Sequence, residues 1–425
     1  MKKGVLTKLQ VIIIAIVVVI IVAGVLYYFF LLAPSAPGPA LPPKDKVVVG
    51  YVDAFSGPFA AGAYPLLITA HQFFIEDVNA KGGLYVPEYG KKLLVELRTY
   101  DSKSDAETLI RLTEKAMVVD KVDLMFAPWG TSQNFAVAPL YEKYGYPLIA
   151  IACGSDQLVH SIRRGELKWA FLFLCQPFFE AKYMADFLQW AGAKTIGIIY
   201  IGDLHGIEHA GAFYRELYAR GNIPVIYEMY PLGVEDLSPL IKKLMEANVD
   251  ALIACSYPAD TILLIKQSMA LGFNPRIWFS GPGTNYPSLM VGTFGTEILK
   301  GMCFYHGGAH AHNTPELREL VRRYRERFNL IPTPHFGPIY AVDQFYFKAV
   351  EKYGLLDRTK IRDALAKETF DTVVGPAKFN MENFYFDFEG NGWVVQYQGG
   401  EMMEVVWPLE WRSADWIPKP PWPKG

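Results

Sequence analysis

The sequence predicts an α/β protein in which two doubly wound, parallel-sheet lobes follow one N-terminal transmembrane helix. Short apolar runs alternate with longer amphipathic runs along most of the chain, which is typical of strands joined by crossover helices. The chain has 425 residues, which is longer than a domain with a single hydrophobic core usually is, so two lobes are expected. A long apolar run near the N-terminus predicts the transmembrane helix.

The N-terminal apolar run covers residues 9–33 and is broken only by one glutamine and a pair of tyrosines. As a helix, at about 1.5 Å per residue, it is long enough to span the roughly 30 Å hydrocarbon layer of a bilayer. Three lysines precede the run, and no Lys or Arg follows it before Lys44. This bias predicts that residues 1–8 are cytoplasmic and that the body of the protein lies outside, attached to the cell membrane.

A cleaved signal peptide is the alternative interpretation of this segment, and small residues just after the run could offer a cleavage site. The apolar core of a signal peptide is about 7–15 residues long, which is shorter than residues 9–33, so an uncleaved anchor is favoured. Residues 34–44 are rich in proline, which predicts an extended, semi-rigid linker. The soluble body is expected to begin near Asp45.

The first series of strands and helices starts after the linker. Residues 47–52 are its first predicted strand, and a turn at residues 54–62 leads into a helix whose apolar residues recur at near-helical spacing. Gly82 and Gly83 end that helix at about Asn79. The rest of the series is predicted as strands at residues 93–100, 123–127 and 147–152 and helices at residues 105–119 and 133–144.

A second series of the same kind follows Trp169, and the break before it indicates a second lobe. Its predicted helices cover residues 179–191, 206–220, 237–247 and 259–271, and its predicted strands cover residues 195–200, 224–230, 251–254 and 276–279. Three further helices are expected at residues 315–328, 338–353 and 358–367. The tail beyond Phe370 is rich in aromatic residues and glycine, which favours short hairpins packed on one lobe.

Charge and motif content argue against nucleic-acid binding and catalysis. The formal net charge is -2, and the arginines clustered at residues 318–327 alternate with glutamates, as on a solvated helix face. No HExxH, GxSxG, Walker-type or GxGxxG motif is present, so neither a catalytic residue nor a cofactor is predicted. The histidines of HGGAHAH, at positions 306, 310 and 312, lack accompanying cysteines or acids, so no metal site is predicted.

The four cysteines are widely spaced, and each lies in or beside an apolar run. No CxxC pair is present, so buried free thiols are expected, although one disulfide could form in an extracytoplasmic compartment. Their connectivity cannot be deduced from the sequence.

Six loops at the predicted carboxyl ends of strands are the candidate ligand-binding segments, because open parallel sheets bind ligands there. They cover residues 56–58, 129–132 and 152–155 in the first lobe and residues 202–205, 257–260 and 281–285 in the second. Thr131 and Ser132 stand just before a predicted helix, where backbone N–H groups and the helix dipole favour a ligand carboxylate.

Each of these residues also has an ordinary structural explanation. Ser56, Thr131 and Ser132 could be turn formers or helix N-caps. Trp129 and Tyr257 could be core aromatic residues, and the loop histidine could be satisfied by water. Six such loops at strand ends together favour the binding interpretation.

Several stretches resemble the branched-chain amino-acid-binding proteins that serve ABC importers and have the type I periplasmic-binding fold. The resemblance runs in order from Val47 to about Ala377 and includes VVVGYVDAFSGPFAAGA, FFIEDVNAKGGL, AVAPLYEKYGYPLIA, DLSPLIKKLMEANVDALI and FDTVVGP. It implies three chain crossings between the lobes, near residues 169–176, 303–310 and 374–377. The implied first lobe is residues 45–171 and 306–376, and the implied second lobe is residues 172–305 and 377–425.

The resemblance also implies roles for individual residues. The ligand's carboxylate would lie against Thr131 and the backbone near Ala152 and Gly154, while Tyr257 would face the ligand from the second lobe. His205 stands where the family usually has a tyrosine. Together with the strand-end loops, this makes the expected ligand-binding residues Ser56, Trp129, Thr131, Ser132, Ala152, Gly154, Ser155, His205, Tyr257 and Gly283.

One departure from the family concerns the ligand's ammonium group. The acid that these proteins place against the ammonium falls at Gly283 in this sequence. Because a buried ammonium without an anionic partner costs several kcal/mol, another acid such as Asp203 or Asp260 must substitute, or the ligand has no ammonium.

The sequence thus predicts an extracytoplasmic solute-binding protein of an ABC importer, whose lobes close on an amino acid or a related polar carboxylate ligand. Its expected partners are that ligand, the permease subunits, and the membrane through the N-terminal helix. One alternative is a membrane-anchored sensory receptor of the same fold, although about eight cytoplasmic residues are too few for a signalling domain. Another is binding of an amine-free ligand, such as an amide, an aromatic acid or a nucleoside-like compound.

Overall fold

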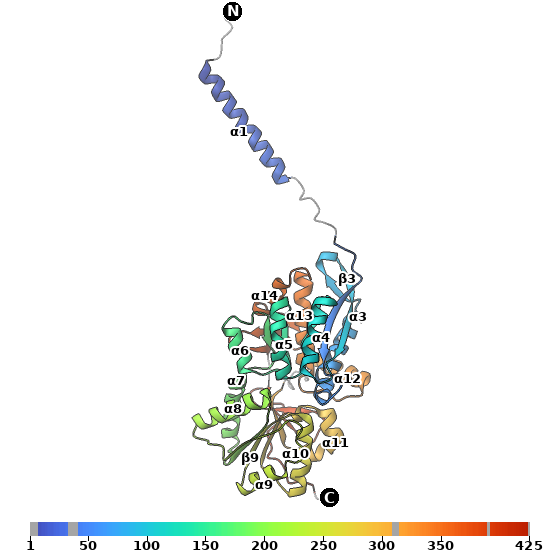
Figure 1. Ribbon diagram of the computed structural model, residues 1–425, viewed down its shortest axis with the longest axis vertical. Helices are drawn as coiled ribbons and strands as arrows, with labels where there is room; N and C mark the ends of the chain where they lie inside the picture. Colours follow the sequence, from blue (N-terminus) through green and yellow to red (C-terminus); the bar gives the residue numbers. More distant parts are fainter. Residues whose placement is uncertain (1–6, 33–40, 308–313, 389–391, 424–425) are drawn as a thin grey trace, which may run out of the picture. The chain divides into compact units, whose positions relative to one another are not determined.

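The computed structural model describes residues 7–32, 41–307, 314–388 and 392–423 (Figure 1). It divides into two units, Met1–Lys44 and Asp45–Gly425, which are treated separately. The first unit contains helix α1 (Lys8–Leu32). Within the described part of the chain, Lys8–Tyr28 of this helix is the one segment long and apolar enough to cross a membrane, and none of it is buried.

The first lobe of the second unit is built around the long buried strand β1 (Lys46–Asp53), which pairs in parallel with two neighbours. The strand order is β2-β3-β1-β4, and a further parallel pair, β5 and β6, follows. The other strands are β2 (Leu84–Val86), β3 (Lys91–Asp101), β4 (Leu124–Phe126), β5 (Leu148–Ala150) and β6 (Ala170–Leu172). The helical segments are α2 (Ala60–Ala63), η1 (Tyr64–Ile68), α3 (Thr69–Ala80), η2 (Pro87–Tyr89), α4 (Ala106–Glu114), η3 (Lys115–Val119), α5 (Thr131–Tyr144) and α6 (Asp156–Arg163).

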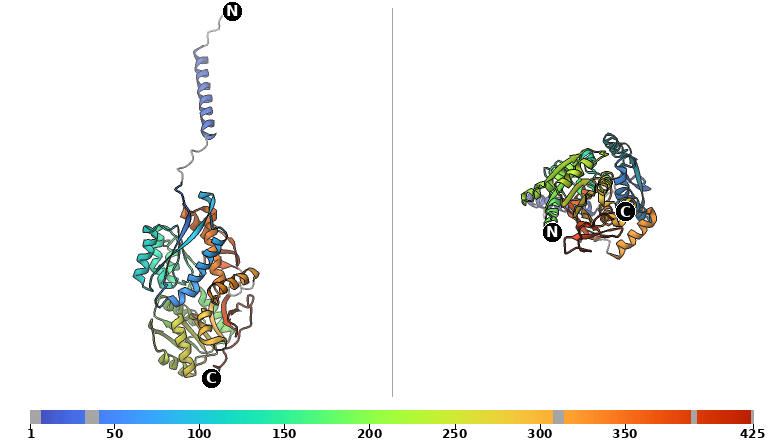
Figure 2. Two further views of the ribbon diagram at one scale, coloured as in Figure 1. Left: turned by 90° about the vertical axis from the view of Figure 1, so that its right-hand side faces the viewer. Right: turned by 90° about the horizontal axis from the view of Figure 1, so that it is seen from below.

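The second lobe is the lower one in the left view of Figure 2. It is built on one seven-stranded sheet in the order β16-β15-β11-β10-β9-β7-β8. Its inner strand β9 (Ala251–Ser256) is buried at every residue, as expected of a sheet covered on both faces. The other strands are β7 (Ile196–Ile201), β8 (Ile226–Tyr230), β10 (Ile277–Pro282), β11 (Met302–Gly307), β15 (Gly392–Tyr397) and β16 (Met403–Trp407), the last two antiparallel. The helices are α7 (Pro177–Trp190), α8 (Leu204–Ala219), α9 (Ser238–Glu246), α10 (Pro258–Leu271), η4 (Gly283–Asn285) and α11 (Pro287–Leu299).

The chain then returns to the first lobe. Helices α12 (Pro315–Phe328), α13 (Phe336–Tyr353) and α14 (Arg358–Lys367) follow, and α13 packs against α3. The short strands β12 (Phe370–Thr372), β13 (Gly375–Asn380) and β14 (Tyr385–Phe388) form an antiparallel sheet that contacts α13, α14 and β6. The fold class is therefore the predicted one, with two α/β lobes connected by three crossings.

The position of the third crossing differs from the sequence analysis, which assigned every residue after 376 to the second lobe. The rings of Phe379 and Phe386 pack against Phe345 of α13, with centroids 5.6 and 5.7 Å away, so β13 and β14 complete the first lobe. Only β15 and β16 join the second sheet, and the crossing follows Phe388, two strands later than expected. The alternation of apolar residues predicted the hairpin, but not the lobe that it covers.

Residues 45–425 contain their own hydrophobic cores. All the buried residues of both cores follow Lys46, and no described residue of α1 contributes to them. This part of the chain therefore has what it needs to fold without the N-terminal helix. All four cysteines are buried and free, as the sequence predicts.

Candidate functional site

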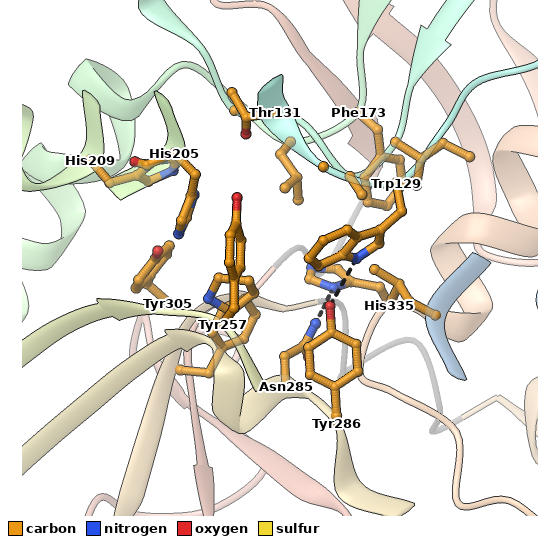
Figure 3. A pocket seen from close by; sticks show the side chains of 18 of the residues that line it. Trp129, Thr131, Phe173, His205, His209, Tyr257, Asn285, Tyr286, Tyr305 and His335 are labelled. Carbon is orange, nitrogen blue, oxygen red and sulfur yellow. Dashed lines mark hydrogen bonds between the residues drawn. The ribbon is translucent and has the colours of Figure 1, made fainter. Parts of the chain in front are cut away.

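A cavity lies between the two lobes, where carboxyl ends of the parallel strands meet (Figure 3). About 560 Å³ of it, counting the part that opens to solvent, is not filled by protein atoms. Its first-lobe wall comes from segments that follow β4, β5 and β6, from η1 and from the start of α13, and its second-lobe wall from segments around α7, α8, β9, β10 and β11. This is the position at which open α/β sheets bind ligands.

Six of the expected ligand-binding residues line this cavity, namely Trp129, Thr131, Ala152, Gly154, His205 and Tyr257. Figure 3 shows Trp129 and Thr131 approaching it from one side and Tyr257 and His205 from the other. Four expected residues do not line it, and these are Ser56, Ser132, Ser155 and Gly283.

The three serines outside the cavity have the ordinary roles that the sequence left open. Ser56 is exposed, and its Oγ donates a hydrogen bond to Asp101 (2.6 Å) in a turn. Ser155 is the N-cap of α6, where its Oγ accepts from the Leu158 N–H (3.1 Å). Ser132 lies half-buried in the first turn of α5, which begins at Thr131, two residues earlier than expected.

Gly283 has a steric reason for being glycine. It is buried in η4, and a Cβ atom built on its backbone would lie 1.7 Å from Oγ1 of Thr261 on α10. No side chain fits there unless α10 or η4 shifts. The acid that the family carries at this position is therefore excluded by the packing of this chain.

The first-lobe wall presents mainly backbone groups. Helix α5 starts at N-cap Gly130, which has a left-handed φ of 102° and provides no side-chain cap for the first helical N–H groups. The Gly130 N–H itself donates to the Ala152 carbonyl (3.2 Å), which ties the two first-lobe loops together. Asp53 accepts from the Trp129 N–H (3.1 Å), and burial raises the pKa of this carboxyl to about 6. The wall thus offers N–H donors and the positive end of a helix dipole.

Two side-chain hydrogen bonds join the lobes across the cavity (Figure 3). The Trp129 Nε1–H donates to the hydroxyl of Tyr286 (3.0 Å), and Asn285 Nδ2 lies 2.9 Å from His335 Nδ1. The rings of Trp129 and Tyr257 also meet across the gap, with centroids 5.1 Å apart. The structure is therefore that of a closed pair of lobes.

Two histidines of α8 form much of the second-lobe wall. His205 stacks on Tyr257 and its Nε2 lies 3.1 Å from the Gly281 carbonyl, while His209 Nδ1 lies 2.9 Å from the His205 carbonyl. Because a carbonyl only accepts, each of these ring nitrogens carries a hydrogen. Burial lowers the pKa of His205 to about 3 and that of His209 to about 4, so both rings are neutral at physiological pH.

Glu180 of α7 is the residue of this wall that the sequence analysis missed most clearly. Its side chain is buried in the cavity wall, and its Oε2 lies 3.3 Å from His209 Nε2. Burial raises its pKa well above the ordinary value and outweighs the opposite effect of a hydrogen bond with the Cys175 thiol. Asn285 also lines the cavity, as do Tyr286, Tyr305 and His335, which had not been predicted. Asn285 stood within a candidate loop, but the others had no strand-end signal.

No group of three or more His, Cys, Asp or Glu that could hold a metal ion occurs among the described residues. His310 and His312 of the HGGAHAH segment lie outside the described residues, as does the side chain of His306.

A family model for periplasmic binding proteins matches residues 46–401. The "Leu/Ile/Val-binding protein homolog 7" of Brucella melitensis is 23% identical over 390 residues, which cover 87% of this chain and 90% of that protein. Among solved structures, the branched-chain amino-acid-binding protein LivJ of Streptococcus pneumoniae with isoleucine has a TM-score of 0.70 at 19% identity, over 88% of this chain and 99% of that one. A solute-binding protein of Rhodopseudomonas palustris with p-hydroxybenzoic acid has a TM-score of 0.71 at 18% identity, over 89% and 98%.

Proposed function

The chain belongs to the periplasmic binding protein family, and we propose that it is the extracytoplasmic solute-binding protein of an ABC importer. In this role the two lobes close on one small ligand, and the closed form presents a changed surface to the permease. The protein binds and releases its ligand without chemical turnover.

The observation that carries this proposal is the cavity between facing strand ends, lined from both lobes and bridged by direct hydrogen bonds. The Trp129–Tyr286 and Asn285–His335 contacts join the lobes beside the empty volume. A ligand in the cavity would touch both walls, so its binding energy would favour the closed arrangement over an open one.

The first-lobe wall supports a carboxylate as one end of the ligand. The uncapped first turn of α5, beginning at Thr131, offers N–H groups in the positive end of the helix dipole, and Gly154 of a neighbouring loop also lines the cavity. The rest of the lining is largely apolar and aromatic, including Leu66, Ile151 and Phe304, which suits an apolar ligand body. An amino acid with an apolar side chain meets these requirements.

An amine-free aromatic acid is the second candidate, and one observation favours it. Glu180 is the single carboxyl group among the described residues that line the cavity, and its buried position favours the neutral form. A neutral wall with many aromatic rings would accept a benzoate-like ligand. The Rhodopseudomonas palustris protein with p-hydroxybenzoic acid has the same fold.

Membrane attachment through α1, with residues 45–425 on the extracytoplasmic side, is part of the same proposal. Lys8–Tyr28 has the length and composition of a membrane span. The mass of the protein extracted from membranes distinguishes the alternatives, because an uncleaved anchor retains residues 1–44 and a cleaved signal peptide does not. A mature mass without these residues would contradict the anchor.

A thermal-shift screen of residues 45–425 tests the binding function. We expect leucine, isoleucine or a benzoate to raise the melting temperature, because a ligand that binds only the folded protein stabilises it by mass action. The control is Gly154→Leu, whose side chain would occupy the cavity and should abolish the shift without preventing folding. If none of these acids shifts the wild type, the proposed function fails for these classes.

A further inference from the structure

Glu180 and His209 form a buried polar pair at one end of the cavity. Both side chains are only 2% exposed, and the Glu180 Oε2 atom accepts no hydrogen bond from the described residues. The 3.3 Å separation from His209 Nε2 lacks the geometry of a hydrogen bond. A buried carboxyl oxygen without a donor, on a residue that lines the cavity, leaves an acceptor available for a guest.

The hydrogen-bonding pattern limits how many protons this pair holds. His209 uses its Nδ1–H to donate to the His205 carbonyl, so Nε2 of the neutral ring has only a lone pair to offer Glu180. Burial raises the pKa of Glu180 and lowers that of His209, so the pair as a whole is neutral and holds one titratable proton at physiological pH. Because the His209 ring is neutral, the carboxyl of Glu180 carries this proton.

We propose that Glu180 receives the ammonium group of an amino-acid ligand, replacing the acid excluded at Gly283, and that the Glu180–His209 pair releases its proton when the ammonium binds. This inference rests on the proposed function and names the ligand class within it. The ammonium N–H donates to the Glu180 carboxylate, and the displaced proton leaves to solvent, so the charge buried in the cavity remains balanced.

The other nearby acids, Asp203 and Asp260, already accept hydrogen bonds within the second lobe. Asp203 accepts from the Tyr257 hydroxyl (2.5 Å) and from the Gly206 N–H (2.9 Å). Asp260 accepts from the Tyr257 N–H (3.1 Å) and from the hydroxyl of Tyr230. Neither aspartate lines the cavity, whereas Glu180 does. Of the acids that could substitute for the missing family residue, Glu180 alone meets the cavity.

Gly154 shows how close the first-lobe loops lie to the polar pair of the second lobe. A Cβ atom at Gly154 would lie 3.1 Å from His209 Nε2, so the first-lobe backbone passes close to the histidine of this pair. An α-amino acid carries its carboxylate and ammonium on one carbon atom. A ligand held at its carboxylate by the first-lobe loops would therefore carry its ammonium beside His209, whose Nε2 lies 3.3 Å from the Glu180 carboxyl.

Several titratable groups surround the pair and must be considered in any proton measurement. They come from every element packed against it and comprise Asp156 of α6, Cys175 before α7, Asp203 and His205 at the start of α8, Cys255 of β9 and Tyr305 of β11. The cysteine and tyrosine pKa values are raised by burial, so these groups stay neutral across the range in which the pair titrates.

Isothermal titration calorimetry of residues 45–425 at pH 7 tests the inference. Titrations in phosphate and in Tris, whose ionisation enthalpies differ, count the protons released. The probes are leucine and 4-methylpentanoate, the same acid without its amine. We expect leucine to release about one proton, and Glu180→Gln to abolish the release and weaken leucine binding by roughly 10- to 100-fold.

The matched control is Asp186→Asn, on the same helix α7 as Glu180. It neutralises a half-exposed carboxyl that pairs with Arg220 at the end of α8, and it should leave leucine binding and proton release unchanged. Thermal unfolding verifies that each variant folds, and Glu180→Asp provides a second variant, which should retain proton release if Glu180→Gln does not fold. Leucine binding without proton release, or tighter binding of 4-methylpentanoate, would overturn the inference but leave the proposed function intact. Failure of both probes and of the benzoates would refute the proposed function and this inference with it.

Discussion

The two walls of the cavity are built in different ways. The first-lobe wall is made of loops at strand ends, where Gly130, Thr131 and Gly154 expose backbone donors. The second-lobe wall is made largely by side chains near the N-terminal ends of helices, where Glu180 of α7 and His209 of α8 present acceptors. One wall is therefore suited to the anionic end of a ligand and the other to a hydrogen-bond donor. The difference sets the direction in which a ligand would lie.

Blocking the first-lobe wall should have the largest effect. A leucine at position 154 would meet the Cys175 carbonyl and His209 Nε2, each 3.1 Å from its Cβ, and would fill the gap between the walls. We expect Gly154→Leu to weaken binding of the ligand found in the thermal screen by roughly 100-fold, because overpacking opposes closure. Gly211→Ala on α8, whose Cβ meets only the Tyr227 hydroxyl at 3.9 Å, is the control. Unchanged affinity in Gly154→Leu would break the comparison, because the wall would then not be a ligand surface.

The second-lobe wall should make stability depend on pH. The pKa of His209 is lowered to about 4 in the folded protein, so its stabilising contribution is complete above the unfolded pKa of about 6.5 and is lost as the pH falls towards 4. As the pH falls across this range, we expect the unfolding free energy of the wild type to decrease by roughly 1–3 kcal/mol more than that of His209→Gln. Urea unfolding at pH 7, 5.5 and 4 measures it. A wild type that gains stability relative to the variant on acidification would show that His209 is charged in the fold.

Removing the hydrogen bond between the two walls should weaken ligand binding by a smaller factor. Trp129→Phe and Tyr286→Phe each remove the bond of 3.0 Å while keeping an aromatic ring in place. We expect each to weaken ligand binding by roughly 3- to 10-fold, and the double variant to lose little more than either single one. Calorimetric titration of the four proteins gives the coupling. Strictly additive losses would indicate that the two residues act independently.

Ser56 provides the smallest expected effect. It was predicted to touch the ligand but lies exposed and bonded to Asp101, away from the cavity. We expect Ser56→Ala to change ligand affinity by less than about twofold, as exposed substitutions usually do. A tenfold loss would mean that the ligand extends beyond the described cavity.

The same contrast explains how far the sequence could be interpreted. The two lobes, the alternation of strands and helices, and the first-lobe contacts at Trp129, Thr131 and Gly154 follow from local rules, since loops after parallel strands meet at one sheet edge. Helices α6 and α11 were not predicted, because α6 has only eight residues and α11 contains Gly292 and Gly295, the second with a non-helical φ of 71°.

Other features depend on contacts between distant segments. Glu180 lies on an ordinary amphipathic helix, and only the approach of α8 brings His209 beside it. The lobe covered by β13 and β14 is decided by Phe345, which precedes them by some thirty residues and belongs to another helix. The steric exclusion at Gly283 likewise requires the position of Thr261. No local pattern contains this information.

A crystal structure of residues 45–425 grown with the best-binding acid of the screen tests the central claim most directly. Electron density for the acid should lie between the walls, with its carboxylate at the first turn of α5 near Thr131 and Gly154 and, for an amino acid, its ammonium against Glu180. Density for the acid at any other place on the protein, with the cavity closed and empty, would contradict the account.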